Sequence, residues 1–455
     1  MKLNVEQEAA FQNIQSGKNI FLTGPAGSGK SFLIRHTVEW GNATRKNIAV
    51  TALTGCAALL LIGRAKTLHS WAGIGLGKES VDTLVETITR NPNVKRRWKK
   101  TDMLIVDEIS MMQPELFDKM DAIGKRVRNC GKPWGGIQLI LCGDYFQLPP
   151  VVKGQGGISG ELCAPGRFAF ESPMWKASEL VPIVLTKIER QTDVEFQTLL
   201  NECRIGAPSP KSIALLKSRQ GLDWKKHLIK PTLLFSRNAD VDSINEKNIH
   251  ALKKPIHTLR ATTVLERPAD DPTLDVPRGE ALQRYIQRLD NDANYNEELE
   301  LCIGCQVMLL MNKDIGGGLV NGSRGVVVNF RMDGVPIVQF LHGDPIPIEK
   351  HRWTSNDCPA IHREQIPLRV AYAISIHKSQ GATLDCALVD IGSSVFEYGQ
   401  AYVALSRVRN LESLYIWNVD ASKIMAHPTV VEYYKTLSGP PTVLDEDPQE
   451  PGIPE

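Results

Sequence analysis

Residues 24–31, which read GPAGSGKS, have the composition and spacing of a loop that binds phosphate groups. An apolar run at 19–23 is typical of a buried strand and 31–40 favours a helix, so backbone N–H groups and a helix N-terminus converge on the loop. We expect the Lys30 amine to reach the β- and γ-phosphates and the Ser31 hydroxyl to bind Mg²⁺. The sequence therefore predicts a site for ATP and Mg²⁺, with loop contacts from Gly24, Ala26, Gly27, Ser28, Gly29, Lys30 and Ser31.

An acidic pair follows an apolar run later in the same half of the chain. Residues 103–106 are typical of a strand buried on both faces, and they deliver Asp107 and Glu108 to its carboxyl end. We expect Asp107 to hold Mg²⁺, directly or through water, and Glu108 to orient and deprotonate the attacking water. A further strand at 137–142 leads to Gln147, which is placed to sense the γ-phosphate. Two acids after a strand are often only surface residues, but the phosphate loop upstream favours the catalytic interpretation.

Weaker polar signals lie around these motifs. Gln7 stands in the first turn of a predicted helix capped by Asn4, where its amide is placed to read an adenine edge; alone it would be a solvated helix residue. Thr54 and Gly55 follow a second predicted strand, and His69 lies just downstream. Hydroxyl, N–H and imidazole groups of this kind suit a single-stranded nucleic-acid backbone. His69 alone would more often be a structural histidine with a local hydrogen bond.

Taken together, these motifs resemble the petite-integration-frequency (Pif) family of superfamily 1 DNA helicases. The matching segments are 4–7, 24–31, 54–55, 67–74, 106–111 and 143–150. The stretch 117–139 is similar to the family's own signature, and it separates this family from RecD-like and Dda-like helicases of the same superfamily. The resemblance extends over about positions 3–418, with Trp134 and Tyr145 standing where phenylalanine is usual.

The resemblance implies roles for polar residues in the second half of the chain. Arg190 and Arg407 match two arginine fingers that act on the γ-phosphate, facing the phosphate loop from the other wall of a cleft. Without the resemblance, a surface salt bridge would explain Arg190 better. The remaining implied roles are contact with the DNA backbone for Ser375, His377 and Lys378, and coupling of that contact to the nucleotide for Gln380 and Gly381.

The alternation of strands and helices predicts an α/β protein built from two RecA-like P-loop NTPase domains, with parallel sheets flanked by helices. We expect the first domain at 1–72 and 101–180 and the second at 181–252 and 371–437. Residues 73–100 interrupt the first as a surface insertion. Its basic end, KRRWKK at 95–100, suits either phosphate contacts or a solvated helix end. By resemblance, this insertion is the wedge that splits duplex DNA.

A second insertion is expected at 253–370. Residues 253–300 are irregular and charged, and short β-like runs follow at 304–311, 325–330 and 337–340. Such strands fit a small barrel, and the resemblance implies an SH3-like one. The glycine triplet at 316–318 is interpreted as a hairpin tip, since no strand-to-helix transition surrounds it. Residues 438–455 are rich in Pro, Asp and Glu and are expected to be a disordered tail.

Net charge, cysteine positions and the lengths of apolar stretches limit which partners and sites the protein can have. A net charge of +2 over 455 residues means that nucleic-acid binding must come from a local stripe of Lys and Arg. The nine cysteines are scattered, and the only close pair, Cys302 and Cys305, lacks partners for a zinc site. No stretch of eighteen apolar residues and no targeting signal is present. We therefore expect an intracellular protein without membrane contact, in the compartment that holds DNA.

The sequence is best interpreted as an ATP-driven helicase that moves along single-stranded DNA and unwinds tailed, forked or structured duplexes. The 5'-to-3' direction comes from the resemblance alone. A single-strand-binding protein is a further candidate partner, and we expect a monomer in solution. Two alternatives are a small-molecule phosphotransferase, whose turnover would ignore DNA, and an inactive binding module, whose DNA affinity would ignore nucleotide.

Overall fold

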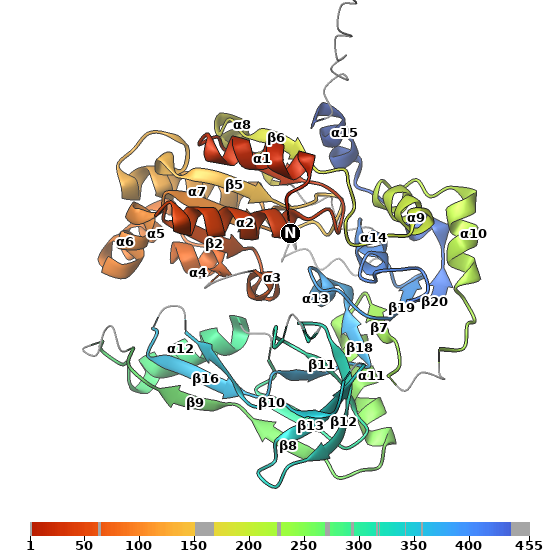
Figure 1. Ribbon diagram of the computed structural model, residues 1–455. Helices are drawn as coiled ribbons and strands as arrows, with labels where there is room; N and C mark the ends of the chain where they lie inside the picture. The colour runs from red at the N-terminus through yellow and green to blue at the C-terminus, as the bar shows by residue number, and fades with distance from the viewer. Residues whose placement is uncertain are drawn as a thin grey trace, which may run out of the picture.

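The computed structural model describes residues 2–61, 65–150, 168–224, 229–268, 274–292, 295–314, 317, 319–341, 343–355 and 358–437. Two parallel sheets, each flanked by helices, and a region of antiparallel strands make up this part of the chain (Figure 1). The predicted α/β class is thus confirmed. Within the described residues no helix is long and apolar enough to cross a membrane. The tail expected at 438–455 lies outside them, as does most of the glycine triplet.

The first sheet has six parallel strands in the order β3-β2-β4-β5-β1-β6. The order makes β4, β5 and β1 neighbours, so the segments that follow them emerge at one edge of the sheet. This edge therefore receives the phosphate loop, the acidic pair and Gln147. The strands are β1 (Ile20–Thr23), β2 (Ile48–Ala52), β3 (Lys66–Thr67), β4 (Met103–Asp107), β5 (Gln138–Cys142) and β6 (Val181–Val184).

Helices cover both faces of this sheet (Figure 1). In α7 the buried Phe117, Met120 and Ile123 recur at helical spacing and share a core with Leu104 and Val106 of β4. The helices are α1 (Val5–Gln15), α2 (Lys30–Ala43), α3 (Gly55–Leu60), α4 (Leu68–Ala72), α5 (Val81–Arg90), α6 (Pro92–Lys100), α7 (Pro114–Arg128) and α8 (Pro173–Ala177), with 3-10 turns at Ile109–Met111, Pro133–Gly136 and Ala169–Glu171.

The segment 73–100 contains α5 and α6, and each of these helices packs one face against the core of the first domain. Trp98 is fully buried, its indole N–H donates to the Ala72 carbonyl at 3.0 Å, and its ring lies 4.6 Å from that of Trp71. Neither tryptophan is therefore available to stack on a base. Apolar burial, rather than nucleic acid, explains the tryptophan within the basic run.

The second sheet is also parallel, in the order β18-β7-β19-β20. Its strands are β7 (Thr232–Phe235), β18 (Ala373–Ser375), β19 (Ala387–Ile391) and β20 (Leu414–Val419). The accompanying helices are α9 (Val194–Arg204), α10 (Pro210–Ser218), α11 (Asn238–Ala251), α13 (Ile376–Ser379) and α14 (Gln400–Leu405), with a 3-10 turn at Ala421–Lys423.

Antiparallel strands between β7 and β18 form the inserted region, drawn at the bottom of Figure 1. It contains a five-stranded sheet in the order β14-β13-β12-β11-β17, a three-stranded sheet β15-β16-β9 and a two-stranded ribbon β10-β8. The bounds are β8 (His257–Arg260), β9 (Thr262–Leu265), α12 (Gly279–Asp292), β10 (Glu298–Leu301), β11 (Gln306–Leu309), β12 (Arg324–Phe330), β13 (Pro336–Phe340), β14 (Ile346–Pro347), β15 (His351–Thr354), β16 (Ile361–Gln365) and β17 (Leu368–Val370).

Strand pairing divides one short run and corrects one predicted boundary. Residues 370–376 are shared between two sheets, because β17 pairs with β11 of the insertion, whereas β18 pairs with β7 of the second sheet. The expected start of the second domain at residue 181 is wrong, because β6 pairs in parallel with β1 along Val181–Val184. The first domain therefore extends through β6, and the connection to the second domain follows it.

The chain returns to the first domain at its described end. Helix α15 (Pro428–Leu437) buries Val430 in the core of the first sheet, and the Tyr433 ring stacks on Phe170 at 4.0 Å. Close by, Arg204 at the end of α9 forms a bidentate ion pair with Asp144, with both nitrogen–oxygen distances at 2.9 Å. The Asp144 side chain is fully buried and that of Arg204 is 12% exposed. This ion pair ties the second domain to the loop that carries Gln147.

Replacing Arg204 with alanine should lower the free energy of unfolding by about 3–5 kcal/mol, because it leaves the Asp144 carboxylate buried without its partner. Urea denaturation of the purified chain measures the change. Lys211→Ala is the matched control, since it removes an ion pair with Glu195 whose side chains are 80% and 48% exposed. Equal stability of the two variants would contradict a structural role for the buried pair.

Candidate nucleotide site and nucleic-acid interface

The phosphate loop has a backbone that only glycine adopts readily at three positions, Gly24, Gly27 and Gly29. Gly27 and Gly29 have φ angles of +85° and +86°, and a Cβ atom at Gly29 would stand 2.3 Å from Nε2 of Gln7. The Gln7 side chain therefore lies directly against the loop, where it also completes the capping box of α1 with Asn4. Lys30 begins α2, and its amine donates to the carbonyl oxygens of Gly24 and Pro25 at 2.7 and 2.9 Å. A compact, cationic loop at a helix N-terminus results.

The acidic pair lies at the carboxyl end of β4 as predicted. Glu108 has the left-handed conformation, with φ +55°, and its N–H donates to Asp107 at 3.0 Å. Burial raises the pKa of Asp107. Burial, together with the negative charge of Asp107, raises the pKa of Glu108 to about 7. One Glu108 oxygen accepts a hydrogen bond from Gln380 of the second domain at 2.9 Å, so this carboxyl group spans the two domains.

Arg407 is buried at the end of α14 and is held from several directions. It donates to the carbonyl oxygen of Val403 at 2.7 Å, to those of Ser379 and Ala382 at 3.3 Å, and to the hydroxyl of Ser406 at 2.6 Å. Burial and the nearby charge of Arg190 lower the pKa of Arg407 to about 10, so it remains a cation at neutral pH. Four acceptors thus fix the direction in which this guanidinium points.

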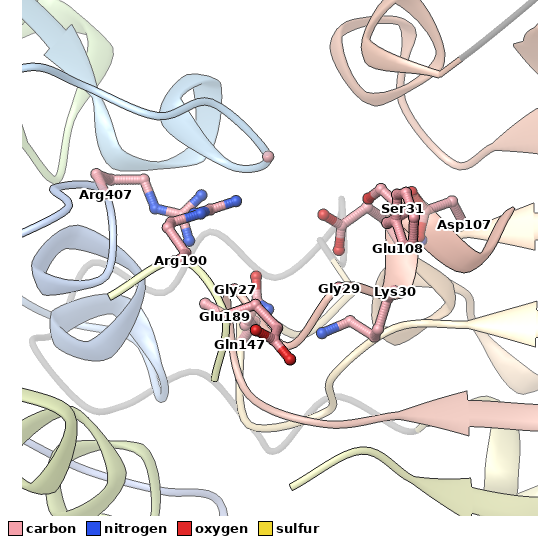
Figure 2. Close-up of a pocket in the computed structure, with 13 residues that line it drawn as sticks. Gly27, Gly29, Lys30, Ser31, Asp107, Glu108, Gln147, Glu189, Arg190 and Arg407 are labelled. Atoms are coloured by element: carbon pink, nitrogen blue, oxygen red, sulfur yellow. The ribbon is translucent and has the colours of Figure 1, made fainter. Parts of the chain in front are cut away.

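Arg190 was expected on the wall of the cleft opposite the phosphate loop, but its backbone is attached to that loop. Its guanidinium lies beside that of Arg407, across the gap from Lys30 and Glu108 (Figure 2). Its backbone N–H, however, donates to the Gly27 carbonyl at 3.2 Å, so the residue is attached to the phosphate loop and not to the second sheet. Burial lowers the pKa of Arg190, and its Nη1 atom has no hydrogen-bond partner among the described residues. A buried, unpaired guanidinium nitrogen is suited to an anionic ligand.

A cavity of about 300 Å³ brings most of the predicted nucleotide-site residues together. It lies between the phosphate loop, the acidic pair and the two arginines (Figure 2). Its lining includes Ala26, Gly27, Gly29, Lys30, Ser31, Asp107, Glu108, Gln147, Arg190, Gly381 and Arg407 from the predicted set. Gln7, Gly24, Ser28 and Gln380 do not line it, although Gln7 contacts Gly29 and Gln380 bonds to Glu108.

The predicted DNA-contacting residues lie at strand ends of both sheets. Thr54 caps α3 by accepting from the Ala57 N–H at 3.2 Å, and Gly55 begins that helix. Ser375 ends β18 with a buried hydroxyl that lacks a hydrogen-bond partner in the described part of the chain. His69 and His377 are partly buried, and burial lowers the pKa of each. Lys378 is exposed on α13.

Some residues at the site were missed by the sequence analysis. Glu189 and Phe32 also line the cavity, and the buried Tyr402 of α14 accepts a hydrogen bond from the Ala26 N–H at 2.7 Å. Tyr402 stands five positions before Arg407 in the motif that predicted this arginine, but nothing in the sequence indicated a bond to the phosphate loop.

Comparisons with known proteins agree with this geometry. The family model described as PIF1-like helicase matches residues 2–206, and the model of the DNA helicase Pif1 2B domain matches 285–330. Pif1 helicase from Candida albicans is 34% identical with a TM-score of 0.77, covering 96% of this chain and 100% of that one. The chain belongs to the PIF1-like helicase family.

Other members of the PIF1-like family are similar over most of the chain. The ATP-dependent DNA helicase PIF1 of Danio rerio is 39% identical over 440 residues, which is 96% of this chain but only 64% of that protein. Pif1 of Bacteroides sp in complex with ADP-AlF4 gives a TM-score of 0.76 at 28% identity, covering 96% of this chain and 97% of that one. Bacteroides Pif1 bound to ssDNA gives 0.65 at 28% identity with the same coverage.

The donor set suits a nucleoside triphosphate and Mg²⁺. Lys30, Arg190 and Arg407 are cations around one cavity, and the unpaired Arg190 nitrogen favours an anion there. Among the described residues no cluster of three or more His, Cys, Asp or Glu side chains forms a metal site. Mg²⁺ is commonly bound by one or two protein oxygens together with substrate phosphates, which is the donor set that Ser31 and Asp107 provide.

Proposed function

We propose that the protein is an ATP-dependent DNA helicase that translocates 5'-to-3' on single-stranded DNA and unwinds duplex or structured DNA. The observation that carries the proposal is the cavity in which a phosphate loop and an acidic pair of one domain face an arginine anchored in the other. Family membership supports it, as do the structures of Bacteroides Pif1 in complex with ADP-AlF4 and bound to ssDNA.

The proposed chemistry assigns one task to each group. The Gly27 and Gly29 region, with Lys30, binds the phosphates, and Ser31 and Asp107 would hold Mg²⁺, which supplies charge neutralisation to the phosphate oxygens. Glu108 orients the attacking water and accepts its proton, and Gln147 senses the γ-phosphate. Arg190 and Arg407 stabilise the charge that develops during phosphoryl transfer. Gln7 reads the adenine edge.

Domain closure then links hydrolysis to movement. Gln380 donates to Glu108 and lies shortly after Ser375, His377 and Lys378 in the chain. When the segment 375–380 shifts on DNA, Gln380 therefore moves with it, and Gln380 is hydrogen-bonded directly to Glu108, the proposed general base. Alternation between open and closed clefts shifts one set of DNA grips, including Thr54, relative to the other.

The proposal extends to domains, partners and cellular context. We assign the first RecA-like domain to 1–72 and 101–184, with 73–100 as its wedge-like insertion, the second to the sheet β18-β7-β19-β20 with its helices, and the small β-domain to 253–370. The partners are single-stranded DNA and forked or tailed duplexes, in the compartment that holds DNA. The corresponding processes are replication, recombination, repair and telomere maintenance.

Glu108→Gln should keep ATP binding but slow hydrolysis by about 10²-fold or more, since glutamine retains the shape of the side chain but cannot accept the proton. Phosphate release with single-stranded DNA measures the rate, and binding of a fluorescent ATP analogue measures affinity. Glu115→Gln is the control, because Glu115 is exposed in the first turn of α7. An unchanged rate in the Glu108 variant would remove it from the role of base.

Strand displacement tests the function as a whole. Duplexes with a 5' tail, a 3' tail or blunt ends are incubated with protein and ATP, and release of the labelled strand is followed. We expect unwinding of the 5'-tailed duplex only, together with turnover that single-stranded DNA stimulates. Turnover indifferent to DNA would favour a phosphotransferase, and unwinding from 3' tails would refute the direction.

A further inference from the structure

We propose that Glu6, in the first turn of α1, is a positioning residue that sets the orientation of Arg190 in the nucleotide cavity. The inference rests on the proposed function, because it concerns the same phosphoryl transfer. It adds a residue for which neither the motifs of the phosphate loop nor those of the arginines provide a role. The segment that joins the two residues is 185–190, the connection that follows β6.

Glu6 bonds to this connection through both carboxylate oxygens. One oxygen accepts from the backbone N–H of Thr186 at 2.8 Å and from that of Lys187 at 3.3 Å, and the other accepts from the Thr186 hydroxyl. Three donors on two successive residues define the position of the backbone rather than of one side chain. Asn4, the N-cap of α1, adds a bond from its amide to Glu189 at 3.0 Å.

The opposite side of the connection rests on the phosphate loop. The N–H groups of Glu189 and Arg190 donate to the Gly27 carbonyl at 2.9 and 3.2 Å. The contact is close, since a Cβ atom at Gly27 would stand 2.6 Å from Cβ of Arg190, and one at Gly24 would stand 2.3 Å from the Leu185 oxygen. The connection is thus held between α1 and the phosphate loop, and Glu6 supplies most of the bonds on the α1 side.

The position of the Arg190 backbone matters because few bonds hold the guanidinium group itself. Arg407 has four acceptors for its guanidinium, whereas Nη1 of the buried Arg190 has no partner within the described residues. The direction of the Arg190 side chain therefore depends on its backbone. Misplacement of a catalytic group by about 1 Å can cost about 10²-fold in rate.

A purely structural role for Glu6 makes a different prediction. Glu6 and Glu8 both lie in the first turn of α1, where a negative charge stabilises a helix N-terminus. Glu8 is exposed, and none of the three donors in the connection bonds to it. Glu8→Ala therefore removes the same helix-end charge without touching the connection, and it is the matched control.

The test compares Glu6→Ala, Glu6→Gln, Glu8→Ala, Arg190→Ala and the Glu6→Ala/Arg190→Ala double variant of the full chain. Turnover at saturating single-stranded DNA gives kcat and KM, and fluorescent ADP reports binding that does not involve the γ-phosphate. We expect Glu6→Ala to lower kcat by up to about 10²-fold. ADP affinity should be unchanged, Glu6→Gln should recover part of the rate, and Glu8→Ala should match the unmodified protein.

The double variant decides between positioning and separate effects. If Glu6 acts through Arg190, its removal costs nothing further once Arg190 is alanine. Additive losses, or a fall in ADP affinity parallel to that in kcat, would overturn the proposal. So would full turnover of Glu6→Ala when Arg190→Ala is impaired, and that result would leave the proposed function intact. Full turnover of Arg190→Ala would instead refute the finger itself, and the inference with it.

Discussion

Replacing Lys30 with alanine is expected to abolish ATP turnover while the protein stays folded. The amine is the cation nearest the centre of the phosphate loop, where it bonds to the carbonyls of Gly24 and Pro25. Those oxygens cannot bind phosphate, so a bound γ-phosphate would recruit the amine from them. Without it, the negative charge of the phosphates faces the loop carbonyls and the acidic pair without the ammonium group that Lys30 supplies on this side of the cavity.

Phosphate release in the presence of single-stranded DNA measures the loss in the Lys30 variant. Circular dichroism and thermal melting check the fold, which should persist because the amine has no bond outside the loop among the described contacts. Lys18→Ala is the control: Lys18 is exposed, and its amine bonds to the Asn13 side chain, far from the cavity lining. Normal hydrolysis by the Lys30 variant would refute the assignment of the loop.

The nucleotide half of the site could be predicted because its residues are set by local sequence. The phosphate loop lies between β1 and α2, and the acids end β4; each unit is a strand followed at once by the polar group. Parallel strands deliver such groups to a common edge whatever their order, so the motifs meet without knowledge of long-range pairing. Gln147 reaches the cavity for the same reason.

The errors arose where long-range pairing decided the structure. From the sequence, β6 was predicted to start the second domain. Its partner, however, is β1, about 160 residues earlier, and no local pattern indicates this pairing. The run 370–376 is mostly apolar, and its division between two sheets follows from pairing with β11 on one side and β7 on the other. β9 pairs with β16 about a hundred residues later, so it could not be recognised within the irregular stretch.

The bonds that cross between the domains were equally hidden from the sequence. Tyr402 meets Ala26, Gln380 meets Glu108, and Arg204 meets Asp144 only after both domains have folded and docked. Two of these three contacts reach directly into the nucleotide site. Docking of the domains therefore does more than bury surface: it sets the surroundings of the phosphate loop and of the base.

Replacing Arg407 with alanine should lower DNA-stimulated turnover by about 10³-fold or more, the scale of a lost arginine finger. Its guanidinium lies beside that of Arg190 in the cavity (Figure 2), and its four acceptors all belong to the second domain. Its contribution therefore depends on cleft closure, unlike that of Lys30. Arg407→Lys should not restore the rate, because an ammonium group lacks the planar fork that fits phosphate oxygens.

Loss of Arg407 also frees the carbonyls of Ser379 and Ala382, so a structural explanation must be separated from a catalytic one. Affinity for single-stranded DNA and the melting temperature report on the structure around these carbonyls, and turnover reports on the chemistry. Arg409→Ala, two residues later and exposed, is the control. A variant that melts earlier but hydrolyses ATP at the normal rate would make Arg407 a structural residue. Retained DNA affinity with lost turnover would place its guanidinium at the transferring phosphate, because the fold and the DNA grip would then be intact and only the closed cavity incomplete.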